Sequence, residues 1–315
     1  MMPVTKSNMT LRGGPISFYV RRARRILPPF YVAMGMSLLL EWLWIGHKTG
    51  THWDDSLPVT RNAVLSAIFM LQNVWYVSKI NHVFWSVAVE WQIYFWFPFF
   101  IACWKRTGAL KSLGTTLIVV YALTFLLHHG QTFVHDRNVQ ITGFAPILYG
   151  LFCIGMFAAG IVYGDLQTFA ELRTRVSWAS CALLSAAIVL LVTHLGRGPA
   201  DLFVGISSAC VIIDCALNST GPLSRIFSWA PLVFVGTFAY SLYLIHAPLI
   251  QILWKFVIEP LKLGPVTSYW LLLFAGTPII SGVAYLFFLA FERPFLNTRK
   301  GAPSIEEQTS LSPAP

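Results

Sequence analysis

The stretch Val83–Trp104 reads VFWSVAVEWQIYFWFPFFIACW, an apolar run of 22 residues that is long enough to cross a bilayer as a helix. Its one formally charged residue, Glu90, lies well inside the run. A carboxylate in that position costs at least ~2.5–3.5 kcal/mol on insertion scales, so a functional role is its first interpretation. The alternative is a structural carboxylate whose hydrogen bonds hold the helices together.

The composition of the whole chain, like that of this run, is typical of a membrane protein. Mean hydropathy is +0.64, 56% of the residues are apolar and 11% are charged. Soluble domains carry about 25% charged residues. These values predict an all-α polytopic membrane protein. The net charge of +9 does not indicate nucleic-acid binding, because the basic residues lie at the ends of apolar runs, as the positive-inside rule describes.

Eight stretches are apolar and long enough to be predicted as membrane spans. They are 26–46, 83–104, 113–129, 144–163, 176–195, 202–217, 231–252 and 269–291. The segment 59–78 is predicted to lie along the outer surface instead. With that arrangement, fifteen Lys and Arg residues lie on the inner side and seven on the outer side. This asymmetry predicts a multi-pass membrane protein with both termini in the cytoplasm.

The chain is predicted to form one membrane domain over 1–300. A tail over 301–315, rich in Pro, Ser and Glu, is predicted to be disordered and cytoplasmic. The five cysteines all fall within apolar runs and show no metal-ligand spacing, so we interpret them as small buried residues. No metal site is predicted.

Four arginines are concentrated directly before the first predicted span. Arg21, Arg22, Arg24 and Arg25 form the sequence RRARR. On a helix, members of this block that are three or four residues apart share a face. Guanidinium groups bind phosphates through paired hydrogen bonds, so one interpretation is a site for a phosphorylated cofactor at the inner surface. The other is a positive anchor that only orients the first span.

Polar side chains accompany the intramembrane glutamate. At helical spacing, Ser86, Glu90 and Tyr94 share one face of their span. A polar stripe of this kind lines a cavity or a contact between helices. A transporter or other nonenzymatic membrane protein, in which Glu90 lines a conduction path, is therefore an alternative to an enzyme.

A histidine in another span completes the candidate residues. His246 lies in the stretch 236–248, GTFAYSLYLIHAP, with Tyr243 three positions before it. Histidine acts as a base or as an oriented donor near neutral pH, although a packing role in a kinked helix is the alternative. We take Glu90 and His246 as candidate catalytic residues and the four arginines as candidate cofactor-binding residues.

Four separated blocks of the sequence together resemble the acyltransferase 3 family of integral-membrane O-acyltransferases. They are FYVRRARRILPPFYV at 18–32, NHVFWSVAVEWQIYFWFP at 81–98, GTFAYSLYLIHAP at 236–248 and FERPF at 291–295. Their order and spacing follow the family and extend over nearly the whole chain. The resemblance implies a ten-span enzyme of the inner (plasma) membrane that moves an acyl group, often acetyl, from acyl-CoA to a hydroxyl. The implied acceptor is a glycan, a lipid-linked sugar or a small natural product.

The resemblance also implies roles for the candidate residues. The paired arginines would hold the phosphates of acyl-CoA, with acetyl-CoA as the expected donor, and Glu90 would be the family's intramembrane glutamate. The implied partners are acyl-CoA, the hydroxyl-bearing acceptor and membrane lipids.

The start of the chain departs from the family pattern. In the family, two further spans precede the basic block, and the first carries an Arg and a His that are separated by ten residues, the His being the proposed catalytic base. Here the basic block already begins at Arg21, and no His follows Arg12 at that distance. We therefore expect a misplaced start codon, a truncated gene or an inactive member of the family.

Overall fold

The computed structural model describes Leu11 and residues 13–46, 50–77, 79–164, 167–192 and 197–296. Within these ranges the chain is helical and has no strand beyond an isolated bridge between Trp75 and Val139. Seven helical segments in the same ranges are long and apolar enough to cross a membrane. The composition-based prediction of an all-α polytopic membrane protein is confirmed.

These seven segments correspond to seven of the eight predicted spans, with shifted ends. They are Gly14–Ile45, Phe84–Thr107, Ala109–Gln131, Ile141–Tyr163, Ala200–Leu217, Ala239–Leu261 and Pro265–Phe295. The remaining prediction, 176–195, corresponds to helix α8 (Trp178–Val192), beyond which residues 193–196 lie outside the described part of the chain. The predicted tail 301–315 and Arg12 also lie outside it.

Helix α2 (Gly14–Leu40) begins well before the predicted start at residue 26 and contains the whole basic block. Gly13, in the left-handed conformation at φ 76°, precedes its first turn. The helix then continues into the π-helical turn η1 (Glu41–Ile45). The predicted span 26–46 is the apolar part of this longer helix, because arginine is a good helix former and extends the helix past the apolar stretch.

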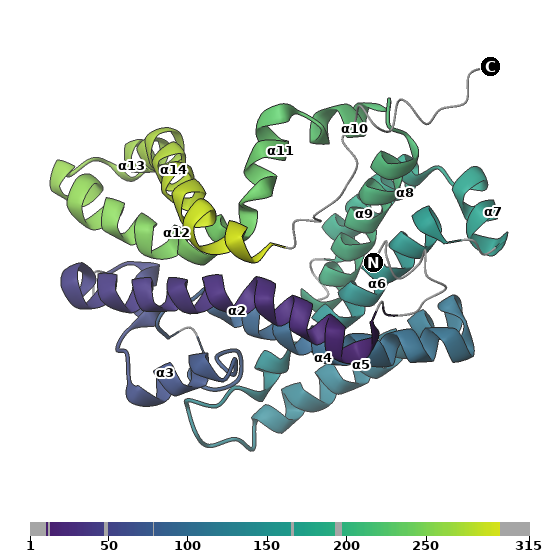
Figure 1. Ribbon diagram of the computed structural model, residues 1–315, viewed down its shortest axis with the longest axis horizontal. Coiled ribbons are helices and arrows are strands. Elements are labelled where there is room, and N and C mark those ends of the chain that lie inside the picture. Colours follow the sequence, from purple (N-terminus) through teal and green to yellow (C-terminus); the bar gives the residue numbers. More distant parts are fainter. Residues whose placement is uncertain are drawn as a thin grey trace.

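Four helices form a bundle around one buried core. They are α2, α4 (Phe84–Thr107), α12 (Ala239–Leu253) and α14 (Thr277–Phe287). Figure 1 shows α2 along α4, with α12 and α14 above them. Phe30, Phe84, Leu244 and Ala284 in this core are fully buried, and the rings of Phe30 and Phe84 lie 4.9 Å apart. Residues from four different helices thus exclude solvent from the middle of the bundle.

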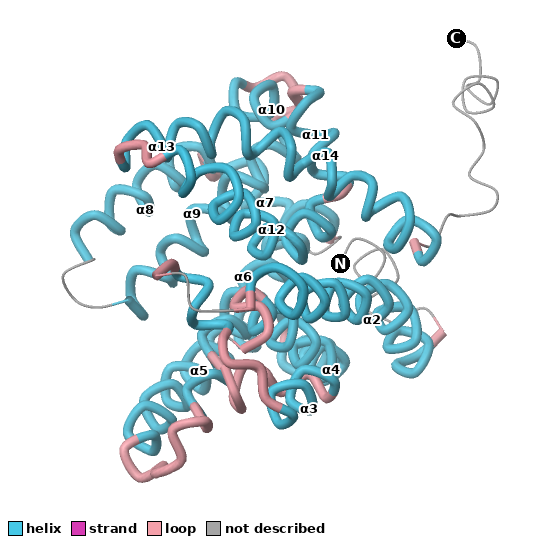
Figure 2. Tube along the Cα trace, turned by 90° about the vertical axis from the view of Figure 1, so that its left-hand side faces the viewer, coloured by secondary structure: helices cyan, strands magenta, loops and turns pink. Residues whose placement is uncertain are grey.

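The second half of α4 belongs to another core. It packs with α5 (Ala109–Gln131), α6 (Pro146–Tyr163) and α9 (Arg197–Leu217), and the buried residues there include Phe97, Trp104, Met156 and Ile213. In Figure 2, α5 lies on the side of the molecule away from α10, α11 and α13. Because α4 contributes to both cores, it fixes the two groups of helices against each other.

Short helices complete the described structure. They are η2 (His52–Ser56), α3 (Arg61–Ile68), η3 (Ile141–Phe144), α7 (Gln167–Arg175), α10 (Pro222–Phe227), α11 (Ala230–Thr237), η5 (Trp254–Ile258), η6 (Glu259–Leu261), α13 (Pro265–Leu271), η7 (Leu272–Gly276), η8 (Phe288–Glu292) and η9 (Arg293–Phe295).

Among the described residues 59–77, the one helix is α3, which has 8 residues. A helix of that length is about 12 Å long and cannot cross a membrane. Thr60 caps it by accepting a hydrogen bond from the Ala63 amide at 3.2 Å, and the Tyr31 hydroxyl of α2 donates to the Ile68 carbonyl at 2.8 Å. The prediction that this segment does not span the membrane is confirmed.

The predicted span 231–252 was wrong in its extent. Its first part is the separate helix α11, and the spanning segment is Ala239–Leu261. The break falls at Phe238, which has φ −121° and ψ 18° and is 1% exposed. The Phe238 ring packs against Phe234 and Tyr285, each at 5.4 Å. Hydrophobicity cannot reveal this break, because the buried residue that interrupts the helix is itself apolar.

Candidate functional site

The basic block lies at the N-terminal end of α2, and its arginines have two kinds of surroundings. Arg22 is half-buried, and its guanidinium lies 4.8 Å from the centre of the Tyr94 ring of α4. Arg21, Arg24 and Arg25 are exposed. A cation over an aromatic ring contributes about 0.5–2 kcal/mol. Arg22 therefore connects α2 to α4, while the other three stay accessible at what we call the arginine end.

Glu90 lies on the face of α4 that approaches the arginine end. Tyr94, one turn further along α4, donates its hydroxyl hydrogen bond to Glu90 Oε1 at 2.6 Å. The Tyr94 ring that contacts Arg22 thus also carries the hydrogen bond to Glu90. The structure therefore brings together two predicted groups, the basic block and the intramembrane carboxylate.

His246 lies further along α12 and reaches α4 through Tyr243. The Tyr243 hydroxyl is 2.5 Å from Ser86 Oγ and donates to the Val83 carbonyl at 2.9 Å. Ser86 is one turn before Glu90 on the same face of α4. Polar groups thus run from Glu90 past Ser86 and Tyr243 to His246, along the contact between α4 and α12.

The hydrogen bonding of His246 defines the state of its imidazole. Nδ1 lies 2.8 Å from the Tyr243 carbonyl oxygen. A carbonyl oxygen only accepts, so Nδ1 carries the proton in this contact and Nε2 of the neutral ring has a lone pair. His246 is half-buried and lines cavities of about 460 Å³ and about 380 Å³. It is therefore arranged to accept a proton from a molecule in either cavity.

The segment before α4 holds a second histidine next to His246. The buried Asn81 donates from Nδ2 to the Leu244 carbonyl of α12 at 3.1 Å, and the backbone amide of His82 donates to Ser56 Oγ at 3.1 Å. These bonds fix His82 between η2 and α12. We call this region, defined by His52, His82 and His246, the histidine end.

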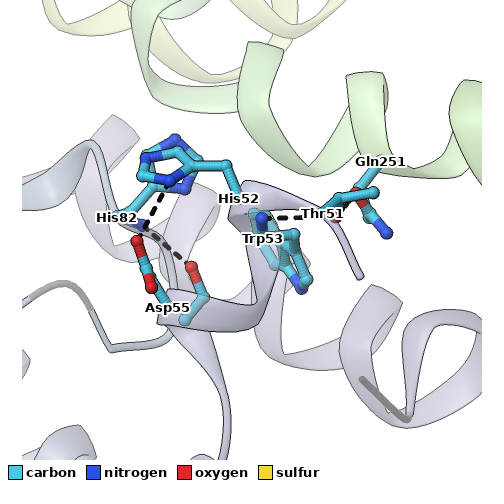
Figure 3. A network of polar contacts seen from close by, with 7 residues as sticks. Thr51, His52, Trp53, Asp55, His82 and Gln251 are labelled. Carbon is cyan, nitrogen blue, oxygen red and sulfur yellow. Dashed lines mark hydrogen bonds and ion pairs between the residues drawn. The ribbon is translucent and has the colours of Figure 1, made fainter. Parts of the chain in front are cut away.

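Charged and aromatic groups surround His82 (Figure 3). The His52 ring meets it edge-on at 4.6 Å, and His52 Nδ1 pairs with Asp55 Oδ2 at 3.0 Å. Burial lowers the pKa of His82, and the charges of His52 and His246 lower it further, while Asp55 acts in the opposite direction. His82 is consequently neutral at physiological pH.

Sequence reasoning missed part of this arrangement. It assigned no role to His82, whose one signal is its position at the start of an apolar run. It also assigned no contact to Glu292, which lies in the block FERPF at 291–295. In the structure, Glu292 is 2% exposed and accepts from the Ser241 amide at 3.2 Å and the Ser241 hydroxyl at 2.5 Å. Glu292 therefore joins the last helix to α12.

The titratable residues do not gather into a metal centre in the part of the chain that is described. No group of three or more His, Cys, Asp or Glu suited to a metal ion occurs among those residues. The described site consists instead of a cationic arginine end, a carboxylate within the bundle and a histidine end.

These features define the class of protein as a polytopic helical membrane protein with a polar site between its helices. A family model described as an acyltransferase domain matches residues 7–289. The chain belongs to this family, as its sequence blocks predict. No solved structure matches the chain.

Three bacterial relatives illustrate the similarity. OatA of Listeria monocytogenes, named a peptidoglycan O-acetyltransferase, is 24% identical over 263 residues, 75% of this chain and 40% of that protein. YrhL of Bacillus subtilis, provisionally named a peptidoglycan O-acetyltransferase, is 22% identical over 74% of this chain and 39% of its own. SAR0937 of Staphylococcus aureus, provisionally named an O-acetyltransferase, is 22% identical over 94% of this chain and 50% of its own. The chain thus spans half or less of these relatives.

Proposed function

We propose that the chain acts as a membrane O-acetyltransferase that moves an acetyl group from acetyl-CoA to a hydroxyl of a cell-envelope glycan. Membership of the acyltransferase family and the names of the relatives support the reaction class. The observation that carries the proposal is the contact of Arg22 and Glu90 with one tyrosine, Tyr94. It connects a cationic surface to a carboxylate inside the membrane, as an enzyme with a phosphorylated donor requires.

The donor is proposed to enter at the arginine end. Acyl-CoA carries its phosphates at one end and its thioester at the other. Phosphates held by the exposed Arg24 and Arg25 would leave the arm with the thioester free to extend towards Glu90. Glu90 keeps Tyr94 oriented along this path and balances the charge of the half-buried Arg22. Membrane lipids surround the remaining apolar faces.

The acceptor is proposed to react at the histidine end. Nε2 of His246 takes the proton of the acceptor hydroxyl, and the acceptor oxygen attacks the carbonyl carbon of the thioester. The carbon–sulfur bond then breaks, the CoA thiolate leaves, and the proton on His246 passes to that thiolate or to solvent. The products are an O-acetyl ester and CoA.

The Glu90→Gln variant tests this proposal, because an amide keeps the shape of the side chain but removes its charge. We expect the variant to be expressed and inserted, and to lose acetyl transfer from acetyl-CoA to a glycan probe. The matched control is Glu259→Gln, since Glu259 is exposed in η6. Near wild-type turnover of Glu90→Gln would show that the carboxylate is structural.

A further inference from the structure

A cavity lined by uncharged polar and aromatic side chains lies at the histidine end. The cavity has a volume of about 460 Å³, within the size range of small-molecule sites. Its lining comes from residues 50–53 around the start of η2, from His82 just before α4, from α12, and from Trp254 at the start of η5. The lining residues that matter for the argument are Thr51, Trp53, His82, His246, Gln251 and Trp254.

Hydrogen bonds build the cavity wall before any ligand arrives. Thr51 Oγ1 donates to Gln251 Oε1 at 2.7 Å, and Gln251 is 3% exposed (Figure 3). Outside the cavity lining, Lys255 Nζ of η5 donates to the carbonyl oxygen of Trp44 at 2.6 Å and to that of Ile45 at 3.2 Å. These contacts attach the end of the first span to η5, while Thr51 attaches the segment after it to α12. The cavity is therefore preorganised, which reduces the entropy lost when a ligand binds.

Two nitrogens of the wall have no hydrogen-bond partner. Trp53 is 2% exposed, and its indole Nε1 is buried without a partner, as is Nδ1 of His82. Unpaired buried N–H groups are rare in folded proteins. For His82 this favours the tautomer with the proton on Nε2, so that Nε2–H is a donor. For Trp53 the unpaired N–H indicates a polar group that the protein itself does not supply.

The chemistry of the lining selects a neutral ligand. None of the described lining residues is Lys, Arg, Asp or Glu, in contrast with the arginine end. Indole rings such as that of Trp254 cover apolar faces, while imidazole, amide and hydroxyl groups pair with neutral polar groups. A ring that has apolar faces and carries hydroxyls at its edge matches both requirements. Sugars have this structure.

We propose that this cavity is the acceptor subsite, and that it binds one neutral sugar ring with a hydroxyl directed at Nε2 of His246. Trp254 covers a face of the ring, and His82 donates from Nε2 to the ring's oxygens. The inference rests on the proposed acetyl transfer, in which the bound hydroxyl gives its proton to His246 and its oxygen attacks the thioester carbon as the CoA thiolate leaves. His82 orients the acceptor, while His246 takes its proton.

Binding of a defined probe to the full-length protein in nanodiscs tests the subsite without catalysis. The probe is the tetramer of N-acetylglucosamine, titrated by calorimetry. Losing the indole face in Trp254→Ala should weaken binding about five- to tenfold. Trp254→Phe keeps an aromatic face and should bind within about twofold of wild type. Trp270→Ala, which removes an exposed tryptophan of α13, is the control and should leave binding unchanged.

Three results would overturn the subsite. These are no binding of the tetramer to wild type, equal binding by wild type and Trp254→Ala, and equally tight binding of a tetramer of galacturonic acid, which is negatively charged. His82→Phe provides a second route, because it keeps an aromatic ring and removes the donor. We expect it to raise the KM for the tetramer several-fold with a smaller change in kcat, and an unchanged KM would contradict the orienting role.

The same preparations separate this inference from the proposed function. CoA is titrated into wild type, Trp254→Ala and Arg24→Ala. If CoA binds and acetyl transfer occurs while the tetramer binds all Trp254 variants equally, the subsite is wrong and the transferase stands. If Trp254→Ala weakens binding of the tetramer and Trp254→Phe does not, but no acetyl-CoA is consumed, the sugar site stands and the transferase is wrong.

Discussion

At the residue scale, Tyr94 has partners of opposite charge on two sides. Its ring lies under the guanidinium of Arg22, and its hydroxyl donates to Glu90. A carboxylate within a membrane span is costly, and a hydrogen bond to a charged group contributes about 1.5–3 kcal/mol. The Tyr94 hydrogen bond and the nearby cation therefore offset part of the cost of Glu90. This arrangement keeps a charge available in the apolar bundle.

The surroundings of His82 lead to a prediction about how the stability of the protein depends on pH. Burial, His52 and His246 lower its pKa from the ordinary value of 6.5, although Asp55 opposes them. The folded protein therefore binds fewer protons than the unfolded chain near pH 6. The stability that results is present above the pKa of His82 in the unfolded chain, and it is lost as the pH falls through the pKa of His82 in the folded protein. The thermal unfolding midpoint should therefore drop between about pH 7.5 and about pH 5, and it should drop less in His82→Phe.

The two proteins serve as each other's control in this measurement. His52, His246 and Asp55 are present in both, so a pH dependence that comes from these groups remains in His82→Phe. An equal drop in wild type and His82→Phe would assign the pH dependence to groups other than His82.

Helical spacing was sufficient to predict some of the site but not all of it. The shared face of Glu90 and Tyr94 follows from their separation of four residues, and the structure places them in contact. The contact of Tyr94 with Arg22 depends on how α2 packs on α4, which no local pattern contains. The same holds for His82, because its neighbours come from η2 and α12, far away in the sequence.

At the scale of elements, α2 connects the two ends of the site. It carries the arginines at one end and continues through η1 to the residues beside the acceptor cavity. The end of this span was predicted to within one residue, because the apolar run stops there. The helix begins earlier than the apolar run, because the polar arginines continue it. The break between α11 and α12 was also missed, since the packing of Phe238 determines it.

The exposed arginines of α2 have a prediction of their own. Arg24→Ala and Arg25→Ala should each raise the KM for acetyl-CoA more than the KM for the acceptor. Loss of one charge-assisted phosphate contact costs roughly 1.5–3 kcal/mol, equivalent to about a ten- to hundredfold loss of donor affinity. Donor titrations of the purified protein measure this effect.

Arg61→Ala is the matched control, because Arg61 is exposed on α3 and lies outside the basic block. It should leave both KM values unchanged. An unchanged donor KM in Arg24→Ala and Arg25→Ala would show that the basic block only orients the first span.

At the scale of the whole molecule, the topology depends on whether α8 crosses the membrane, because this decides on which side the later loops lie. Its 15 described residues correspond to about 22 Å, less than the ~30 Å of a hydrocarbon core. It nevertheless packs along α9, where Ser207 Oγ donates to the Ala182 carbonyl at 3.0 Å. If α8 crosses together with α9, the chain has eight spans and both termini lie in the cytoplasm, as the distribution of Lys and Arg predicts.

Fusions of a phosphatase that is active only outside the cytoplasm check this topology. We expect no activity for a fusion after Pro315 and high activity for a fusion within the loop 132–138, which follows α5. A second pair, before α8 at residue 176 and within 193–196, should give low and high activity. High activity at Pro315 with none in 132–138 would reverse the proposed orientation.

The most direct test of the central claim separates the two substrates by the membrane. Inverted membrane vesicles that contain the protein enclose the tetramer of N-acetylglucosamine, and labelled acetyl-CoA is added outside, on the cytoplasmic face. The account predicts labelled O-acetyl groups on the enclosed tetramer, abolished by Glu90→Gln and retained in Glu259→Gln. Failure of wild type to label the enclosed tetramer, or equal labelling by Glu90→Gln, would contradict a transferase whose donor enters at the arginine end and whose acceptor binds at the histidine end.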